Sequence, residues 1–172
     1  FYLYDNEALK TTLAQLEEAG RPAILFGVTY ALLDFAEQCA MPLKNTIIIE
    51  TGGMKGRKKE LSKAELYRQL QEAFSTAEIH SEYGMTELLS QAYAVNGIYR
   101  CPPWMKVVLR DETDPFSLGG TSGAINVIDL ANLYSCSFIA TEDLGKIHLD
   151  GGFEVLGRMD NTDIRGCSQL TL

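Results

Sequence analysis

The chain has 172 residues and a formal net charge of −8, with 46% hydrophobic and 22% charged residues. This length suffices for a domain with a hydrophobic core, and the negative charge argues against nucleic-acid binding through phosphate contacts. Each apolar run is shorter than the ~20 residues of a membrane span. The start, Phe1–Asp5, lacks signal-peptide features and an initiator Met, so we expect a processed chain or a fragment. The four cysteines are scattered, which favours reduced thiols in a cytoplasmic protein over a zinc site.

The first half of the chain alternates predicted helices with short apolar strands. Asp5 or Asn6 can cap the first helix, and Ser62 with Glu65 has the spacing of a capping box. Alternation at this spacing favours a parallel sheet covered by helices, with strands buried on both faces. The predicted elements, in chain order, are a helix over 5–19, a strand over 23–26, a helix capped by Thr29, a strand over 46–50, a helix after Ser62 and a strand over 77–80.

Glycines follow two of these predicted strands, at Gly27 and at Gly52-Gly53. Ligands bind open α/β sheets at the carboxyl ends of the strands, so we expect these glycines to line one crevice with the motif at Tyr83–Glu87. The basic cluster at Lys55–Lys59 either faces phosphates or is a solvated loop. No Gly-Lys-Ser or Gly-Lys-Thr sequence is present, so this is not a Walker loop.

The motif Tyr83-Gly84-Met85-Thr86-Glu87 contains the parts of a nucleotide-phosphate site. We expect a strand, a tight turn at Gly84 and a helix that opens at Thr86-Glu87, where its N–H groups would face an anion. The Thr86 hydroxyl would lie beside that anion, and the Glu87 carboxylate would hold Mg²⁺. The ring of Tyr83 offers a surface for a base. An ordinary surface turn is the alternative interpretation.

After Asn96-Gly97 the pattern changes to short strands separated by turns, which predicts a mainly antiparallel β section. Gly119–Gly123 lies between two of these strands and is interpreted as a hairpin turn. The fold class is therefore α/β, with a helix-flanked parallel sheet at 1–98 and a β-rich subdomain at 99–172. The predicted strands of the second half lie at 105–110, 124–130, 138–141, 146–149 and 153–156.

Three collinear motifs resemble those of the adenylate-forming enzymes, which include acyl-CoA synthetases, peptide-synthetase adenylation domains and firefly luciferase. They are Tyr83–Glu87, Thr141-Glu142-Asp143-Leu144-Gly145 and the stretch from Gly157-Arg158 to Gly166. The resemblance implies part of an adenylate-forming large domain, with ATP and Mg²⁺ as nucleotide and metal. Glu142 departs from this pattern, because the family usually has Gly there.

The resemblance also implies a role for individual residues. Gly52-Gly53 falls where the family has a glycine loop beside the adenine. In the implied site, Tyr83, next to Gly84, stacks on adenine, and Asp143 accepts hydrogen bonds from the ribose hydroxyls. Thr86 contacts phosphate, and Glu87 binds Mg²⁺. Arg158 contacts ribose or phosphate, and Asp160 lies at the hinge.

Two features of the family are missing from the sequence: the phosphate loop expected upstream of the first helix, and the mobile C-terminal domain with its Lys. We therefore expect the later part of a longer enzyme, inactive by itself. The ending Ile164–Leu170 resembles the acyl-protein synthetase of bacterial bioluminescence (LuxE type), which carries an acyl-accepting cysteine near its C-terminus. Cys167 is the matching catalytic candidate, with Arg158 and Arg165 able to lower its pKa. The alternative is a small structural residue.

The function implied is ATP-dependent activation of a carboxylic acid, expected to be a fatty acid. The acyl group would pass to a protein cysteine and then to a reductase or acyltransferase partner. An aryl- or acyl-CoA ligase of the phenylacetate-CoA ligase type is the first alternative, in which coenzyme A is the acceptor. The second alternative is an inactive nucleotide-binding or interaction module.

Overall fold

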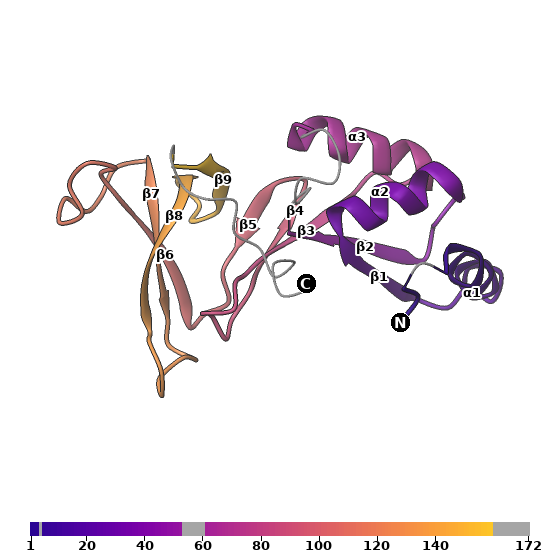
Figure 1. Ribbon diagram of the computed structural model, residues 1–172, viewed down its shortest axis with the longest axis horizontal. Coiled ribbons are helices and arrows are strands. Elements are labelled where there is room, and N and C mark those ends of the chain that lie inside the picture. Colours follow the sequence, from indigo (N-terminus) through magenta and orange to yellow (C-terminus); the bar gives the residue numbers. More distant parts are fainter. Residues whose placement is uncertain (4, 53–60, 160–172) are drawn as a thin grey trace, which may run out of the picture. The chain divides into compact units, whose positions relative to one another are not determined.

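The computed structural model divides the chain into two compact units, Phe1–Ser81 and Glu82–Leu172 (Figure 1). The predicted subdomains, 1–98 and 99–172, stay a prediction. None of the helices in the described residues has the length and apolar character needed to cross a membrane. The residues that the structure describes are 1–3, 5–52 and 61–159.

The first unit is an α/β unit in which two strands run parallel. Strand β1 pairs with β2 from Ala23 opposite Thr46 to Val28 opposite Thr51, which confirms the predicted parallel sheet. Helices α2 and α3 lie side by side over the same face of these strands (Figure 1). The elements are α1 (Asn6–Glu18), β1 (Ala23–Val28), α2 (Thr29–Gln38), β2 (Thr46–Thr51), α3 (Lys63–Phe74) and β3 (His80–Tyr83), whose second half belongs to the next unit.

Local capping signals correctly placed two of the three helices found in the described residues. The Asp5 side chain accepts a hydrogen bond from Ala8 N at the start of α1, and Ser62 with Glu65 forms the predicted capping box of α3. The predicted cap of α2 is wrong, because Val28 occupies the N-cap position without a side-chain hydrogen bond. The Thr29 hydroxyl instead donates to the Glu50 carboxylate at 2.6 Å.

The core of the first unit lies on one face of the strands. Leu25 and Ile48 are buried there beneath Phe35 and Phe74, whose rings stack 5.8 Å apart. On the opposite face, three large side chains are about half exposed or more, so within the described residues the predicted burial of both faces is wrong. These three are Ile24, Phe26 and Ile47.

A buried carboxylate connects the elements of this unit. Glu50, on β2, is only 1% exposed and forms an ion pair with Lys63 at the start of α3. It also accepts hydrogen bonds from Thr29 at the start of α2 and from Ser81 on β3, the latter at 2.5 Å. The Tyr67 hydroxyl lies 2.7 Å from Ser81 Oγ and extends the network. One side chain thereby joins two helices and two strands.

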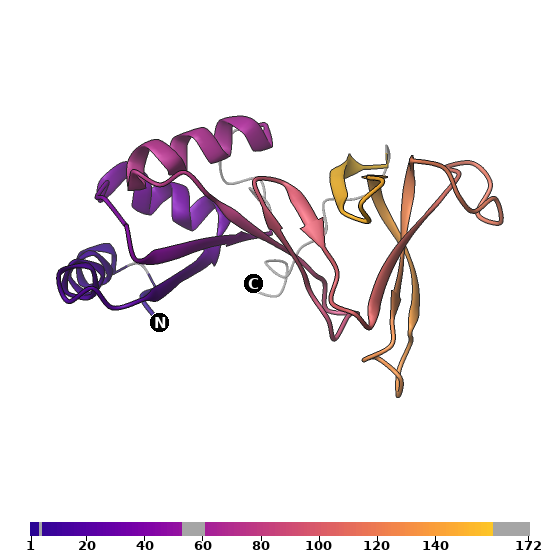
Figure 2. The same ribbon diagram turned by 180° about the vertical axis from the view of Figure 1, so that it is seen from behind.

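The second unit is a mainly antiparallel β structure, as predicted. Its strands follow the order β4-β5-β9-β8-β7-β6, and each neighbouring pair is antiparallel. The orange and yellow strands in Figure 2 are β7, β8 and β9. The strands are β4 (Ala92–Val95), β5 (Ile98–Arg100), β6 (Met105–Arg110), β7 (Ser122–Asp129), β8 (Phe138–Ile147) and β9 (Phe153–Arg158).

Three sequence predictions for the strands need correction. The third strand lies at His80–Tyr83 rather than 77–80, and the helix predicted after Thr86 is absent from the described residues. In its place β4 and β5 form a hairpin with positive φ at Asn96 and Gly97, as an Asn-Gly turn of the primed type requires. Strand β8 continues through the predicted turn at 142–145, because Leu144 pairs with Ala124 on β7 and with Gly157 on β9.

We expect Glu50→Ala to lower the free energy of unfolding by about 2–4 kcal/mol, since it leaves Thr29, Ser81 and Lys63 without their shared acceptor. Glu50→Gln should cost only about 1 kcal/mol, because its amide can donate to the Thr29 hydroxyl while its oxygen still accepts from the other two groups. Urea unfolding of the three chains measures both changes.

Glu72→Ala is the control, since it removes a carboxylate whose i,i+4 ion pair with Arg68 is exposed on both sides. Such a pair contributes about 0.5 kcal/mol or less. Equal unfolding midpoints for Glu50→Ala and Glu72→Ala would contradict the structural role of Glu50.

Candidate functional site

The motif that follows β3 forms a β-turn. Leu88 N donates to Met85 O at 3.0 Å, so Thr86 and Glu87 occupy the two central positions, and both residues are exposed. The predicted helix is wrong because the residues that follow alternate between buried and exposed positions with the period of a strand. The turn therefore presents these two side chains without a helix N-terminus behind them.

Buried polar side chains fix the backbone of this turn. The carboxylate of Asp129 is fully buried and accepts hydrogen bonds from Leu89 N at 2.9 Å and from Ser90 N at 2.8 Å. Asn132 Nδ2 donates to the carbonyl oxygen of Glu87 at 2.7 Å. Burial raises the pKa of Asp129, but hydrogen bonds from Ser90, Leu89 and the backbone nearby outweigh it and hold this pKa below its usual value.

A hydrogen bond joins the first and second motifs. The Tyr83 hydroxyl donates to Asp143 Oδ2 at 2.8 Å across 60 positions of sequence. The Tyr83 ring is 9% exposed and makes edge contacts with Tyr99 and Phe153, at centroid distances of 6.0 and 5.7 Å. Burial raises the pKa of the Tyr83 hydroxyl, and the charge of Asp143 raises it further. Tyr83 therefore remains a protonated donor to this carboxylate.

A bulge in β8 carries Asp143. Ala124 and Asn126 on β7 are two positions apart, and their partners on β8, Leu144 and Ala140, are four positions apart. Strand β8 therefore has two extra residues here. The Thr141 hydroxyl closes the bulge by accepting from Asp143 N at 3.1 Å and donating to a β7 carbonyl at 2.9 Å. Bulges re-aim side chains at functional sites, and this one lies at a predicted site residue.

Arg158 lies opposite Asp143 on β9. Its Nη2 donates to Glu142 Oε2 at 2.8 Å, while its Nε lies 3.9 Å from Asp143 Oδ1. Glu142 is the position at which the sequence departs from the adenylate-forming pattern, so this ion pair involves the atypical residue. Both partners are about two-fifths exposed, and such an ion pair contributes little to stability.

The second unit contains most of the predicted site residues: Tyr83, Gly84, Thr86, Glu87, Asp143 and Arg158. Gly52 belongs to the first unit, where it follows β2 with φ of +70° and its carbonyl oxygen lies 3.0 Å from Thr29 Oγ1. Gly53 and Cys167 lie outside the described residues. The shared crevice of these groups stays a prediction, as do the roles of the individual residues.

In the part of the chain that the structure describes, no group of three or more His, Cys, Asp or Glu side chains could hold a metal ion. A cation at Glu87 would therefore need ligands from outside this set, such as phosphate oxygens and water. Mg²⁺ is commonly bound in that way, by one or two carboxylates together with substrate phosphates.

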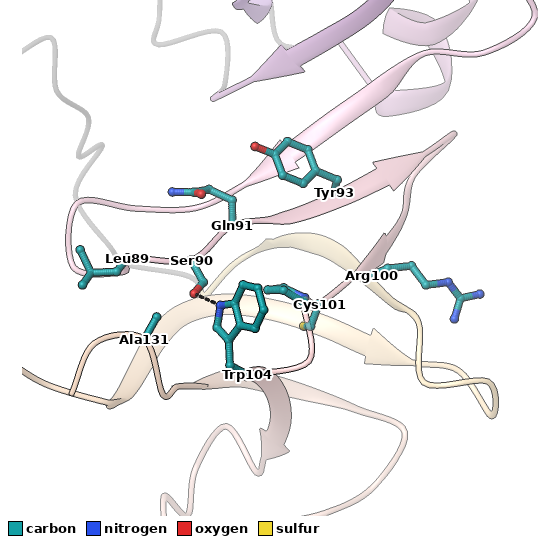
Figure 3. Close-up of a pocket in the computed structure, with 9 residues that line it drawn as sticks. Leu89, Ser90, Gln91, Tyr93, Arg100, Cys101, Trp104 and Ala131 are labelled. Atoms are coloured by element: carbon teal, nitrogen blue, oxygen red, sulfur yellow. Dashed lines mark hydrogen bonds between the residues drawn. The ribbon is translucent and has the colours of Figure 1, made fainter.

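A separate hollow of about 530 Å³ lies beside β4 and β5 (Figure 3). Ser90, Tyr93, Arg100 and Trp104 are among the residues that line it, and none of the predicted site residues does. The geometry of the motifs, rather than the size of this hollow, therefore identifies the candidate site.

Sequence reasoning missed the residues that hold the site in place: Asp129, Asn132, Ser90 and Arg110. Arg110 donates to the carbonyls of Thr141 and Ile125, next to the bulge in β8. A usable signal existed for two of these residues, because Asp and Asn three positions apart after a strand are typical of an Asx-type turn. Their contacts with the motif, about forty positions away, had no signal in the sequence.

The chain resembles part of several solved adenylate-forming enzymes. ATP-bound MatB from Rhodopseudomonas palustris is 16% identical with a TM-score of 0.65, over 90% of this chain and 33% of that chain. Coronafacic acid ligase from Pectobacterium brasiliense is 19% identical with a TM-score of 0.64, over 90% and 32%. The amide bond synthetase McbA from Marinactinospora thermotolerans is 17% identical with a TM-score of 0.63, over 90% and 34%.

These matches establish the fold, and the chain spans about a third of the length of the solved structures. No protein-family model matches the sequence, and no curated protein matches it significantly. The chain therefore has the mixed α/β fold of one part of these solved enzymes, which confirms the predicted fold class.

We expect Tyr83→Phe to lower the free energy of unfolding by about 1 kcal/mol at pH 8, through loss of the hydrogen bond to Asp143. The pKa of Tyr83 is higher in the folded than in the unfolded chain, so its contribution is complete below about pH 10 and declines as the pH rises further. The difference between wild type and variant should therefore shrink above pH 10, as measured by urea unfolding at several pH values.

Tyr134→Phe is the control, because the Tyr134 side chain is fully exposed. This variant should follow the wild type at each pH. A constant difference between wild type and Tyr83→Phe from pH 8 to pH 11 would contradict the assignment.

Proposed function

We propose that the complete protein containing this chain activates a carboxylic acid with ATP and transfers the acyl group to a protein cysteine. The observation that carries this proposal is the hydrogen bond between Tyr83 and Asp143, which joins two motifs of the adenylate-forming pattern. The similarity of fold to ATP-bound MatB supports the same class of reaction.

The groups around Asp143 fit a nucleoside. The Asp143 side chain is about one-fifth exposed, and only its Oδ2 accepts from Tyr83. Each carboxylate oxygen has two lone pairs, so acceptor positions remain for ribose hydroxyls. Arg158, beside it, supplies positive charge for ribose or phosphate oxygens, in competition with Glu142.

The turn residues fit a phosphate group with its cation. Thr86 and Glu87 are exposed next to each other at the tip of the turn. The Thr86 hydroxyl would donate to a phosphate oxygen, and the Glu87 carboxylate would bind Mg²⁺ together with phosphate oxygens. Bound Mg²⁺ would neutralise charge on the phosphates during displacement.

The proposed reaction has two displacement steps. A carboxylate oxygen of the acid attacks the α-phosphorus of ATP, the bond to the β,γ-phosphates breaks, and pyrophosphate leaves. The thiolate of Cys167 then attacks the acyl carbon, AMP leaves and a thioester forms. The role of Cys167 rests on the resemblance of the ending to LuxE-type acyl-protein synthetases. The acid is proposed to be a fatty acid, with an acyl reductase or acyltransferase as the protein partner.

An acyl- or aryl-CoA ligase is the second candidate, and the basic cluster Lys55–Lys59 favours it. Four basic residues close together in an acidic chain would suit the phosphates of coenzyme A. In that case coenzyme A replaces Cys167 as the thiol that attacks the acyl-adenylate.

We expect Asp143→Ala and Glu87→Gln in the complete protein to reduce acid-dependent ATP–pyrophosphate exchange about 10²-fold or more, because each removes a group that contacts the nucleotide or its cation. Cys167→Ser should retain exchange but lose the protein thioester, which mass spectrometry detects after incubation with ATP and a fatty acid. Cys136→Ser is the matched control, since Cys136 is an exposed free cysteine.

The same measurements separate the alternatives. Normal acylation of Cys167→Ser would exclude the acyl-protein reaction, and AMP formation that requires coenzyme A would favour the ligase. Absence of both ATP binding and exchange in the wild-type protein would favour an inactive module.

A further inference from the structure

We propose that Asp129 and Asn132 are positioning residues that hold Thr86 and Glu87 in place for the metal-nucleotide complex. The inference rests on the proposed function for the roles of Thr86 and Glu87. It adds two residues outside the three motifs, and they act through the backbone of the turn rather than by contact with a ligand.

The Asp129 carboxylate is fully occupied by donors. Its Oδ2 accepts from Leu89 N at 2.9 Å and from Ser90 N at 2.8 Å, and its Oδ1 accepts from Ser90 Oγ at 2.7 Å and from Ala131 N at 3.1 Å. The side chain is 0% exposed, so water does not share these bonds. Three of the four donors are backbone N–H groups, which makes the carboxylate an anchor for main chain.

The indole of Trp104 sets the direction of one of these bonds. Trp104 Nε1 donates to Ser90 Oγ at 2.9 Å (Figure 3). An indole nitrogen is only a donor, so the Ser90 hydroxyl accepts this bond and directs its own hydrogen to Asp129. The relay fixes the side chain of Ser90 as well as its backbone N–H.

Asn132 holds the turn at a second point. It is 5% exposed, and its Nδ2 donates to the carbonyl oxygens of Glu87 at 2.7 Å and Cys136 at 2.9 Å. The amide thus links the motif directly to the connection between β7 and β8. Asp129 and Asn132 belong to the same turn, because Asn132 N donates to Asp129 O at 3.1 Å.

These contacts fix the motif on both sides of its exposed side chains. Tyr83, before the turn, is held by Asp143, whereas Leu89 and Ser90, after the turn, are held by Asp129. The Glu87 carbonyl between them is held by Asn132. A binding group needs a backbone fixed to within about 0.5 Å to act efficiently, and buried hydrogen bonds supply that constraint here.

The chemistry of Asp129 predicts a graded series of variants. Asp129→Ala removes all four acceptor contacts. Asp129→Asn can keep its oxygen toward the N–H groups of Leu89 and Ser90, so that the two bonds to the motif backbone remain. Its amide nitrogen, in place of Oδ1, loses the bonds from Ala131 N and from the Ser90 hydroxyl. The Asn variant should therefore rescue most of the effect of the Ala variant.

The test measures acid-dependent ATP–pyrophosphate exchange by the complete protein as a function of Mg²⁺. We expect the Mg²⁺ concentration at half-maximal rate to rise about tenfold in Asp129→Ala and about twofold in Asp129→Asn, because Glu87 is misplaced. The KM for the acid should change by less than about twofold in both variants. A merely structural role would lower the amount of active protein without moving the Mg²⁺ dependence.

Asp111→Asn is the matched control. Asp111 also accepts from two backbone N–H groups and one hydroxyl, those of Thr113 and Asp114, but it lies in the connection between β6 and β7. The Mg²⁺ dependence of the Asp111→Asn variant should equal that of the wild type. If Asp129→Ala does not fold, Asn132→Ala provides the same test, because it releases the Glu87 carbonyl while leaving the carboxylate in place.

Hydrogen exchange of the Leu89 and Ser90 amides in the absence of nucleotide reports the anchoring independently of activity. Faster exchange with an unchanged Mg²⁺ dependence in an active protein would overturn the inference and leave the proposed function intact. A folded wild-type protein without Mg²⁺-dependent exchange of pyrophosphate would overturn the proposed function, and the inference with it.

Discussion

A carboxylate can be buried only where donors surround it, and among the described residues each unit of this chain contains such a group. Glu50 joins two helices and two strands in the first unit, through Thr29, Lys63 and Ser81. Asp129 joins the motif turn to the connection between β7 and β8 in the second. In both units the acceptor serves segments that are distant in sequence. The arrangement of these segments thus depends on polar groups as well as on the apolar core.

This organisation explains how exposed residues at the candidate site can have defined positions. Thr86 and Glu87 are exposed, as residues that bind a ligand must be, and they lie on a turn rather than on a regular element. The buried donors and acceptors that precede and follow the turn give it the rigidity that a helix would otherwise provide. The Tyr83 hydroxyl has an equivalent role beneath Asp143, where burial keeps it protonated. A rigid scaffold that presents short polar segments is typical of functional loops.

Sequence patterns predicted the elements whose signals are local. The capping residues Asp5 and Ser62 located α1 and α3, and alternation of apolar residues located β6 with its exact bounds. The helix expected after Thr86 was wrong. The composition of Glu87-Leu88-Leu89 suits a helix, but the N–H of Leu89 is bonded to the distant Asp129, and the chain goes on to form a hairpin at Asn96-Gly97. Likewise, Thr29 has the composition of a helix cap, yet a buried acceptor on β2 takes its hydroxyl. The motifs predicted which residues form the candidate site. The contacts that support the site join residues up to sixty positions apart, and no local sequence pattern predicts such contacts.

The bulge in β8 depends on the number of residues in this segment as well as on their identity. A strand with two residues fewer between Ala140 and Leu144 would pair regularly with β7, and by ordinary criteria it would be a better strand. It would, however, keep a single residue between these two positions, so it could not provide both the Asp143 carboxylate that accepts from Tyr83 and the Thr141 hydroxyl that closes the bulge. A deletion of one residue would instead turn the following side chains to the opposite face of the sheet. Because the second motif, Thr141–Gly145, spans the bulge, the number of residues in this segment is as strict a requirement as the identity of Asp143.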